Sequence, residues 1–118
     1  MEEKNRTYLM YIIDIHTAMN RIKEYLQDMD FTEFKRDYKT VDAVIRNFEI
    51  IGEASKNLPL EIRERYPEIP WQEMYYLRNK VSHEYFGIDY EIIWDIAINH
   101  LPENIQQVER ILKLESKT

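Results

Sequence analysis

The fold is decided by residues 8–29, which read YLMYIIDIHTAMNRIKEYLQDM. Large apolar residues recur here in alternating steps of four and three, at Tyr8, Ile12, Ile15, Met19, Ile22, Leu26 and Met29. Because an α-helix has about 3.6 residues per turn, residues at this spacing form one continuous stripe along one side of a helix. The spacing therefore predicts a long helix over residues 5–29 that packs against other helices.

The next segment continues the same periodicity. Asp30-Phe31-Thr32-Glu33 has the form of a capping box, in which two side chains bond to the first free amides of a helix. Apolar residues follow at helical spacing, namely Phe34, Tyr38, Val41, Ile45, Phe48 and Ile51. We expect one second helix, as long as the first, that runs from this box toward Leu58.

Prolines interrupt the middle of the chain at Pro59, Pro67 and Pro70. Residues 60–66 are expected to form one short helix, and Pro70 suits the first turn of the helix that follows. That helix is expected to end at Gly87. Its buried side would carry Trp71, Met74, Leu77 and Val81, with Tyr75 or Tyr76 flanking.

A last helix is expected from Asp89, a good capping residue, to the end of the chain. Its apolar positions are Ile92, Ile93, Ala97, Leu101, Ile105, Val108 and Leu112. Pro102 lies within it and predicts a kink or a split, because proline lacks an amide hydrogen. Together these elements predict an all-α fold, an antiparallel four-helix bundle with one short additional helix, in a single domain over residues 1–118.

The composition narrows the classes of function. The chain has 118 residues, 44% of them hydrophobic, and no cysteine for a disulfide or a thiolate metal site. Its net charge of −6 argues against a broad basic surface for nucleic acid, so any contact with RNA must be local. No signal-type or membrane-spanning stretch occurs in the sequence, and we expect a cytoplasmic protein that does not bind a membrane.

Residues 78–85 read RNKVSHEY and contain the candidate catalytic groups. Arg78 is a permanent cation that can hold a phosphate through paired hydrogen bonds, and His83 can move a proton near neutral pH. The Asn79 amide can orient either of them, and on a helix it would share a face with His83. A metal-free site for phosphodiester cleavage needs these groups. The alternative is a helix end whose polar side chains lie on the surface or bond to buried carbonyls.

Other polar residues carry weaker signals. His16 and His100 are expected to be packed or surface histidines, since neither has the spacing of a metal ligand. Ser82 is adjacent to His83 in sequence, and adjacent residues on a helix do not face each other. The two glycines, Gly52 and Gly87, leave little material for a loop that cradles phosphates or a dinucleotide. We therefore expect neither a metal nor a cofactor.

The pattern Arg78-Asn79-x-x-x-His83-x-Tyr85 resembles the signature of HEPN ribonucleases, in particular the HepT-like toxins that are paired with a minimal nucleotidyltransferase antitoxin. Three further stretches resemble the same subfamily in kind and in order. They are residues 51–54 (IGEA), residues 69–71 (IPW), and residues 85–89 (YFGID) followed by Trp94. The resemblance spans nearly the whole chain.

The resemblance implies a homodimer whose two motif helices face each other and form a composite, metal-independent endoribonuclease site. His83 would be the general base or the general acid, Arg78 would hold the scissile phosphate of the RNA, and Asn79 would orient them. The expected products are a cyclic 2′,3′-phosphate and a 5′-hydroxyl.

Two more residues have a role by resemblance or position. Tyr85 resembles the tyrosine that the nucleotidyltransferase antitoxin modifies with AMP, which would place bulk and negative charge where RNA enters. The alternative for Tyr85 is a core or rim aromatic. Glu53, mid-helix beside Gly52 in an apolar stretch, is a supporting candidate that would pair with Arg78; equally, it would be an exposed glutamate beside a tolerated glycine.

Two classes of function remain open. The first is a ribonuclease toxin restrained by its antitoxin, which the intact set of Arg78, Asn79, His83 and Tyr85 favours. The second is a non-catalytic HEPN interaction module that binds a nucleotide or docks a nucleotidyltransferase, which the acidic charge balance favours slightly. A neighbouring reading frame for a small nucleotidyltransferase would support either class, and its absence would weaken the toxin pairing.

Overall fold

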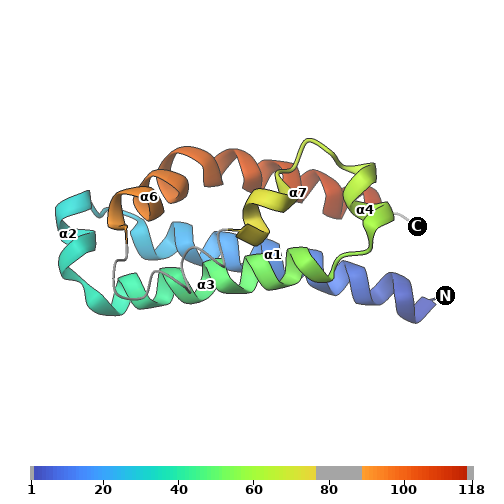
Figure 1. The fold of residues 1–118 in the computed structure, drawn as a ribbon, viewed down its shortest axis with the longest axis horizontal. Helices are drawn as coiled ribbons and strands as arrows, with labels where there is room; N and C mark the ends of the chain where they lie inside the picture. Colours follow the sequence, from blue (N-terminus) through green and yellow to red (C-terminus); the bar gives the residue numbers. More distant parts are fainter. Residues whose placement is uncertain (1, 77–88, 117–118) are drawn as a thin grey trace.

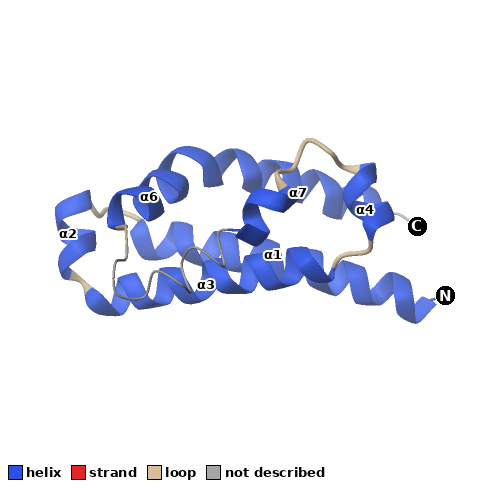
Figure 2. Cartoon of the chain, in the orientation of Figure 1, coloured by secondary structure: helices blue, strands red, loops and turns tan. Residues whose placement is uncertain are grey.

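The computed structural model describes residues 2–76 and 89–116, with side chains from Tyr8 onward. These residues form helices joined by short loops and contain no strand, as Figure 2 shows. The expected all-α helical bundle is thus confirmed. Leu77, Val81 and the stop at Gly87 lie outside the described residues.

The first helix, α1 (Glu2–Leu26), is the helix that the apolar stripe predicts. The stripe residues from Tyr8 to Leu26 are all buried, with at most 8% of any of them exposed. The helix ends three residues earlier than expected, because Asp28 has a φ of 66°, a left-handed conformation that aspartate tolerates better than most residues. Met29 follows this turn and packs at the edge of the core.

The second predicted helix is two helices, α2 (Phe31–Arg36) and α3 (Tyr38–Asn57). The capping box is confirmed, since Asp30 and Glu33 exchange side-chain and backbone hydrogen bonds of 2.8 Å and 3.0 Å. The break is at Asp37, whose carboxylate accepts a 3.1 Å hydrogen bond from the Thr40 amide and so caps α3. The expectation of one continuous helix was wrong.

The break at Asp37 also changes which residues face the core. Tyr38, expected in the buried stripe, is the first residue of α3 and is 72% exposed. Val44, which was not expected there, is fully buried, whereas Ile45 is half-buried. The buried residues Val41, Val44, Phe48 and Ile51 follow one another in steps of three, four and three, so the core-facing side of α3 passes through Val44 and leaves Ile45 at its edge.

The prolines bound the elements that follow. The short helix α4 (Leu60–Arg65) agrees with the prediction, and residues 71–76 are helical in the described part of the next element. Pro70 precedes these turns, and its carbonyl accepts a 3.0 Å hydrogen bond from the Met74 amide. Trp71 and Met74 are buried, as the sequence predicts.

The last predicted helix is continuous but changes its winding. It consists of α6 (Tyr90–Asp95), a π-helical segment η1 (Ile96–His100) and α7 (Leu101–Glu115). The Leu101 amide bonds to the Ile96 carbonyl five residues earlier. Pro102, in the first turn of α7, has no amide hydrogen to offer the Ile98 carbonyl, so the turn before it widens.

Three of these elements run lengthwise beside one another (Figure 1). α1 packs against both α3 and α7 and runs in the opposite direction to them. α2 lies across the end of the bundle where α1 ends and α3 begins (Figure 1). There Phe34 of α2 packs on Trp94 of α6, with ring centroids 5.4 Å apart. α4 lies at the other end, beside the start of α1 and the end of α7. Among the helices described, none combines the length and the hydropathy that crossing a bilayer requires.

Candidate functional site

The four motif residues Arg78, Asn79, His83 and Tyr85 lie outside the described residues, so their predicted roles stay predictions. The structure defines what precedes and follows them. The chain enters this segment from the helical turns at residues 71–76 and leaves it at Asp89. Both ends are anchored by specific contacts.

The helical turns before the motif are anchored to α3 and α4. The indole nitrogen of Trp71 donates a 3.0 Å hydrogen bond to the Tyr66 carbonyl, which follows α4. Met74 contacts Ser55 of α3, whose hydroxyl lies 3.8 Å from the methionine sulfur. Ser55 is 1% exposed and also donates to the Ile51 carbonyl at 2.7 Å. These contacts fix where the chain enters the motif segment.

The chain after the motif is anchored to α2. The Asp89 carboxylate accepts a 3.1 Å hydrogen bond from the Ile92 amide, which confirms the predicted helix cap. Tyr90, the first residue of α6, contacts Phe34 edge to face, with the ring centroids 6.4 Å apart. Trp94, one of the residues that carries the family resemblance, stacks on the same phenylalanine. The aromatic cluster therefore holds the start of α6 in place.

Glu53 lies on the exposed side of α3, whereas its neighbours Ile51, Gly52 and Ala54 are buried. The apolar stretch therefore belongs to the opposite side of the helix, because successive residues are about 100° apart. Glu53 lines a cavity of about 370 Å³ between α1 and α3, together with Asp14, Arg46 and Glu49. The expected pairing of Glu53 with Arg78 falls on a residue outside the described ones.

A second cavity, of about 650 Å³, lies directly beside the entry to the motif segment. Lys56, Arg63, Trp71, Tyr75 and Tyr76 are among the residues that line it. Sequence reasoning did not single it out as a site, because its residues come from α3, α4 and the turns before the motif. The two adjacent tyrosines, Tyr75 and Tyr76, were a local signal that could have indicated it.

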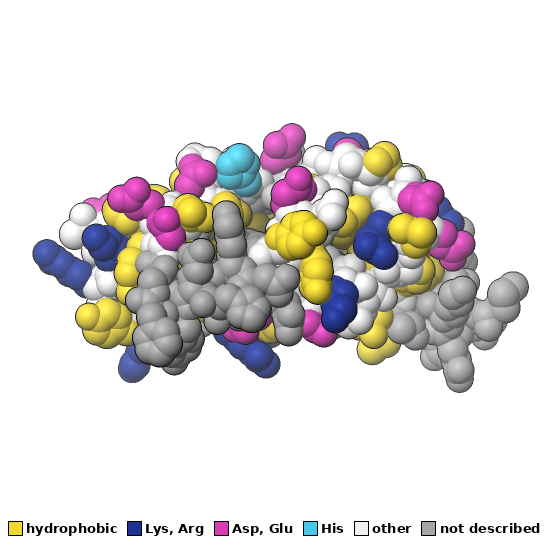
Figure 3. Space-filling view, viewed as in Figure 1, with side chains coloured by type: hydrophobic (Ala, Val, Ile, Leu, Met, Phe, Trp, Pro, Cys, Tyr) yellow, Lys and Arg dark blue, Asp and Glu magenta, His cyan; other side chains and the backbone are white. Residues whose placement is uncertain are grey.

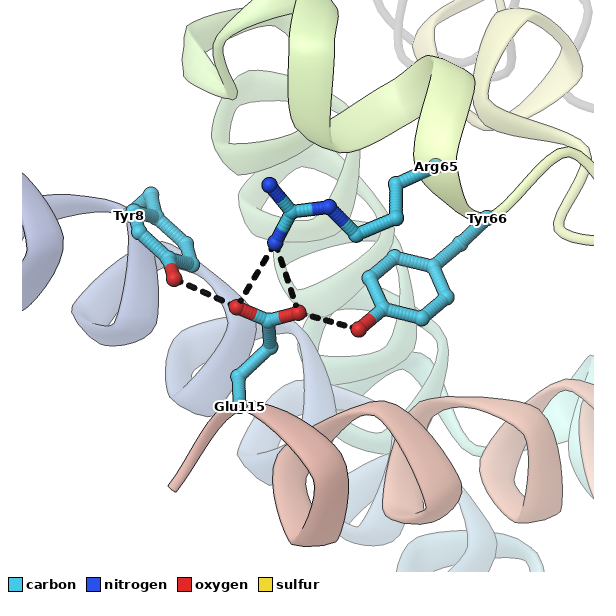
Figure 4. A network of polar contacts seen from close by, with 4 residues as sticks. All are labelled: Tyr8, Arg65, Tyr66 and Glu115. Carbon is cyan, nitrogen blue, oxygen red and sulfur yellow. Dashed lines mark hydrogen bonds and ion pairs between the residues drawn. The ribbon is translucent and has the colours of Figure 1, made fainter. Parts of the chain in front are cut away.

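A polar network joins the end of α7 to α4 and α1, as Figure 4 shows. The Glu115 carboxylate is 7% exposed and accepts hydrogen bonds from the hydroxyls of Tyr8 and Tyr66 and from Arg65. Burial alone would raise the pKa of Glu115, but the hydrogen bonds from Tyr66, Tyr8 and Arg65 outweigh it and lower the pKa. Burial and the bond to Glu115 raise the pKa of Tyr66 to about 12.

The Glu115 network was not predicted. The residues on either side of Glu115 form no motif that would indicate a buried carboxylate. Its partners, Tyr8, Arg65 and Tyr66, are distant along the chain. At neutral pH the two tyrosine hydroxyls stay neutral and the Glu115 carboxylate stays ionised. The network therefore stabilises the packing of the helices and is not suited to proton transfer.

The remaining histidines are surface residues. His16 Nε2 lies 3.1 Å from Glu109 Oε2, where α1 packs against α7. His100 Nε2 lies 3.5 Å from Asp95 Oδ2. No group of three or more potential metal ligands occurs in the described part of the chain. His16 and His100 are therefore placed as expected, as partly exposed side chains with carboxylate neighbours.

Comparison with known proteins gives one consistent result. Residues 15–111 match the model of the family described as "Ribonuclease HepT-like". A Methanocaldococcus jannaschii protein named "Putative RNase" is 50% identical over 87% of this chain and 85% of its own length. A Thermococcus cleftensis protein named "Probable ribonuclease HepT" is 41% identical over 92% of this chain and 98% of its own length. No solved structure matches. The chain belongs to the HepT-like ribonuclease family.

Proposed function

We propose that this protein is a metal-independent endoribonuclease and the toxin of a toxin–antitoxin pair, with Arg78 and His83 as its catalytic residues. One observation carries the proposal: the motif at residues 78–85 lies inside the span that matches the ribonuclease family. The ribonuclease names of the two similar archaeal proteins support it further.

The proposed reaction is a transesterification within the RNA. His83 removes the proton from a ribose 2′-hydroxyl, the 2′-oxygen attacks the adjacent phosphorus, and the bond to the 5′-oxygen breaks. His83 of the other protomer acts as the general acid and donates a proton to the departing 5′-oxygen. Arg78 neutralises the charge that develops on the phosphate oxygens, and Asn79 orients His83 or the phosphate. The products are a cyclic 2′,3′-phosphate and a 5′-hydroxyl.

The division of two proton transfers between two histidines requires a homodimer. An exposed apolar side chain next to the motif segment supports such an interface. Ile92 follows the segment in α6 and is 37% exposed. With Pro70 and Ile96 it lines a cavity of about 550 Å³ that lies between Ile92 and Tyr76. Apolar surface of this kind is typical of protein interfaces.

Restraint of the toxin is proposed to act through Tyr85. A nucleotidyltransferase antitoxin adds AMP to the tyrosine hydroxyl, and the added phosphate repels the RNA phosphate that must approach His83. Glu53 is proposed to support the site by pairing with Arg78. Tyr85 and Glu53 are thus assigned to regulation and to positioning, and neither takes part in bond cleavage.

The test is RNA cleavage by protein freed of any partner and shown by mass to be unmodified. Wild type is incubated with total cellular RNA in excess chelator, beside Arg78→Ala and His83→Ala. Wild type should cut. His83→Ala should lose about 10²–10⁴-fold in rate, the usual contribution of a general acid or base, and Arg78→Ala about 10²–10³-fold, the usual contribution of one group that stabilises charge in the transition state. Tyr38→Phe, on an exposed tyrosine at the α2 end, serves as the matched control.

The alternative function is a non-catalytic module that docks a nucleotidyltransferase or binds a nucleotide. The net charge of −6 favours it, because acidic surfaces repel RNA. If unmodified wild type cuts no RNA, or if the two variants cut as fast as wild type, catalysis by this motif is abandoned. The docking module then becomes the better description.

A further inference from the structure

The 650 Å³ cavity beside the motif segment differs in charge from the other cavities of the described residues. Its lining contains two cations, Lys56 and Arg63, and one carboxylate, Glu73. In the cavity that contains Glu53, three carboxylates face one arginine, and in the cavity between Tyr76 and Ile92, three glutamates line the wall without a lysine or arginine. An anion is therefore best accommodated at Lys56 and Arg63.

Arg63 has an unused hydrogen-bond donor. Its Nε atom is buried but has no hydrogen-bond partner among the described residues. A buried donor without a partner costs about 1–3 kcal/mol, so such atoms in native proteins commonly have a ligand or water as partner. The Nε atom itself has no contact with solvent, but Arg63 lines the cavity, so an anion bound there would lie beside the guanidinium group.

Aromatic rings stand beside the two cations. The rings of Tyr75 and Tyr76 lie with their centroids 5.8 Å apart, and Lys56 Nζ lies 5.8 Å from the centre of the Tyr75 ring. Tyr76 is 54% exposed, and its hydroxyl is held by Gln72 at 3.4 Å. Figure 3 shows basic and hydrophobic side chains next to each other over the region where α4 and the end of α3 lie.

We propose that this cavity binds one nucleotide of a single-stranded RNA, with its base stacked on Tyr76 and its phosphate held by Lys56 and Arg63. Stacking on an exposed aromatic ring beside a local basic patch is how proteins hold unpaired RNA. Tyr76 precedes Arg78 by two residues in sequence, so the subsite lies on the segment that leads into the proposed catalytic motif. The inference rests on the proposed ribonuclease function and specifies its substrate as an unpaired strand.

The subsite also resolves the conflict between an acidic chain and an RNA substrate. Long-range attraction is unfavourable at a net charge of −6, so RNA must be held by contacts close to the cut. A few local contacts favour loops and single strands, whose bases are free to stack, over continuous duplex. Duplex RNA should accordingly bind more weakly than the single strand.

Binding is measured separately from cleavage, by fluorescence anisotropy of a short labelled oligoadenylate in chelator, on the His83→Ala background. Tyr76→Ala should weaken binding roughly tenfold. The double variant Lys56→Gln with Arg63→Gln should weaken binding and flatten the plot of log affinity against log salt by about 0.7 for each phosphate that the protein no longer neutralises. Arg63→Lys keeps the charge and should retain most of that slope.

The matched controls are Tyr38→Ala and Lys39→Gln, an exposed tyrosine and an exposed lysine at the α2 end of the bundle. Both should bind as the parent does, and circular dichroism should show every variant folded. Equal affinity in the cavity variants and the controls overturns the proposal, and so does a parent that does not bind the oligoadenylate. Displacement by AMP at the affinity of the oligoadenylate also overturns it, because the site would then be one for mononucleotides.

The two proposals fail in different ways. If His83→Ala cuts RNA as fast as wild type, the catalytic assignment fails, while the binding data still decide the subsite. If the cavity variants bind normally but His83→Ala is inactive, the subsite fails and the ribonuclease stands.

Discussion

Arg65 and Glu115 join the last turn of α4 to the last turn of α7, with Arg65 Nη1 lying 3.0 Å from one carboxylate oxygen and 3.1 Å from the other. The hydroxyls of Tyr8 and Tyr66 donate to the same two oxygens (Figure 4). One carboxylate therefore holds three helices together at this end of the bundle. Because α4 also carries Arg63, this lock positions one wall of the proposed nucleotide cavity.

Replacing Glu115 with glutamine should destabilise the fold by about 1–3 kcal/mol, because three donors lose their charged acceptor in a buried setting. The measurement is the free energy of unfolding from urea titrations. Glu64→Gln, an exposed residue next to Arg65 on α4, is the control and should change stability by less than about 0.5 kcal/mol. Equal losses in the two variants would contradict the assigned role of Glu115.

The same carboxylate predicts how stability depends on pH. Burial opposes ionisation of Glu115, but the bonds from Tyr66, Tyr8 and Arg65 lower its pKa below the ordinary value of 4.5. A lowered pKa in the folded state contributes stability above the unfolded pKa, and this contribution is lost as pH falls through the folded pKa. Wild type should therefore lose more stability than Glu115→Gln on acidification. Urea midpoints across an acid pH series test this, and parallel curves would refute it.

Asp37 should matter to the start of α3 more than an ordinary surface aspartate does. Asp37→Ala removes the acceptor for the Thr40 amide, whose hydrogen bond also lowers the pKa of Asp37. We expect a lower urea midpoint, with a smaller loss than for Glu115→Gln because Asp37 is solvent-accessible. Asp42→Ala, at a solvent-exposed position within the α3 sequence and not at its end, is the matched control. An unchanged midpoint in Asp37→Ala would mean that the cap does not stabilise α3.

Sequence reasoning succeeded where one helix face meets the core over many turns. The stripe of α1 is one such case, since each position repeats the same requirement for burial. It failed at Asp37, where a single residue ends one helix and begins the next, and the helical period continues across the break almost unchanged. Asp37 followed three residues later by Thr40 was a capping signal that the apolar spacing concealed.

The candidate site was predictable to the extent that its residues are close in sequence. The motif at residues 78–85 is local, and a pattern of residue types was enough to propose it. The cavity proposed to bind a nucleotide is lined by Lys56, Arg63 and Tyr76 from three elements, and no spacing rule connects them. The Glu115 network is assembled in the same way. Only the packing of α4 against its neighbours brings these groups together.

Tyr85→Phe should retain ribonuclease activity but escape inhibition by the nucleotidyltransferase antitoxin. The variant keeps Arg78 and His83 and should cut RNA as wild type does, but it has no hydroxyl to accept AMP. Incubation with the partner nucleotidyltransferase and ATP should therefore add the mass of one AMP residue to wild type, which should lose activity, and leave Tyr85→Phe unmodified and active. Tyr38→Phe removes an equally accessible hydroxyl, since Tyr38 is 72% exposed, and should be modified and silenced as wild type is. Modification of Tyr85→Phe would place the acceptor on another residue. Modification of wild type without loss of cleavage would mean that the partner restrains the toxin by binding instead.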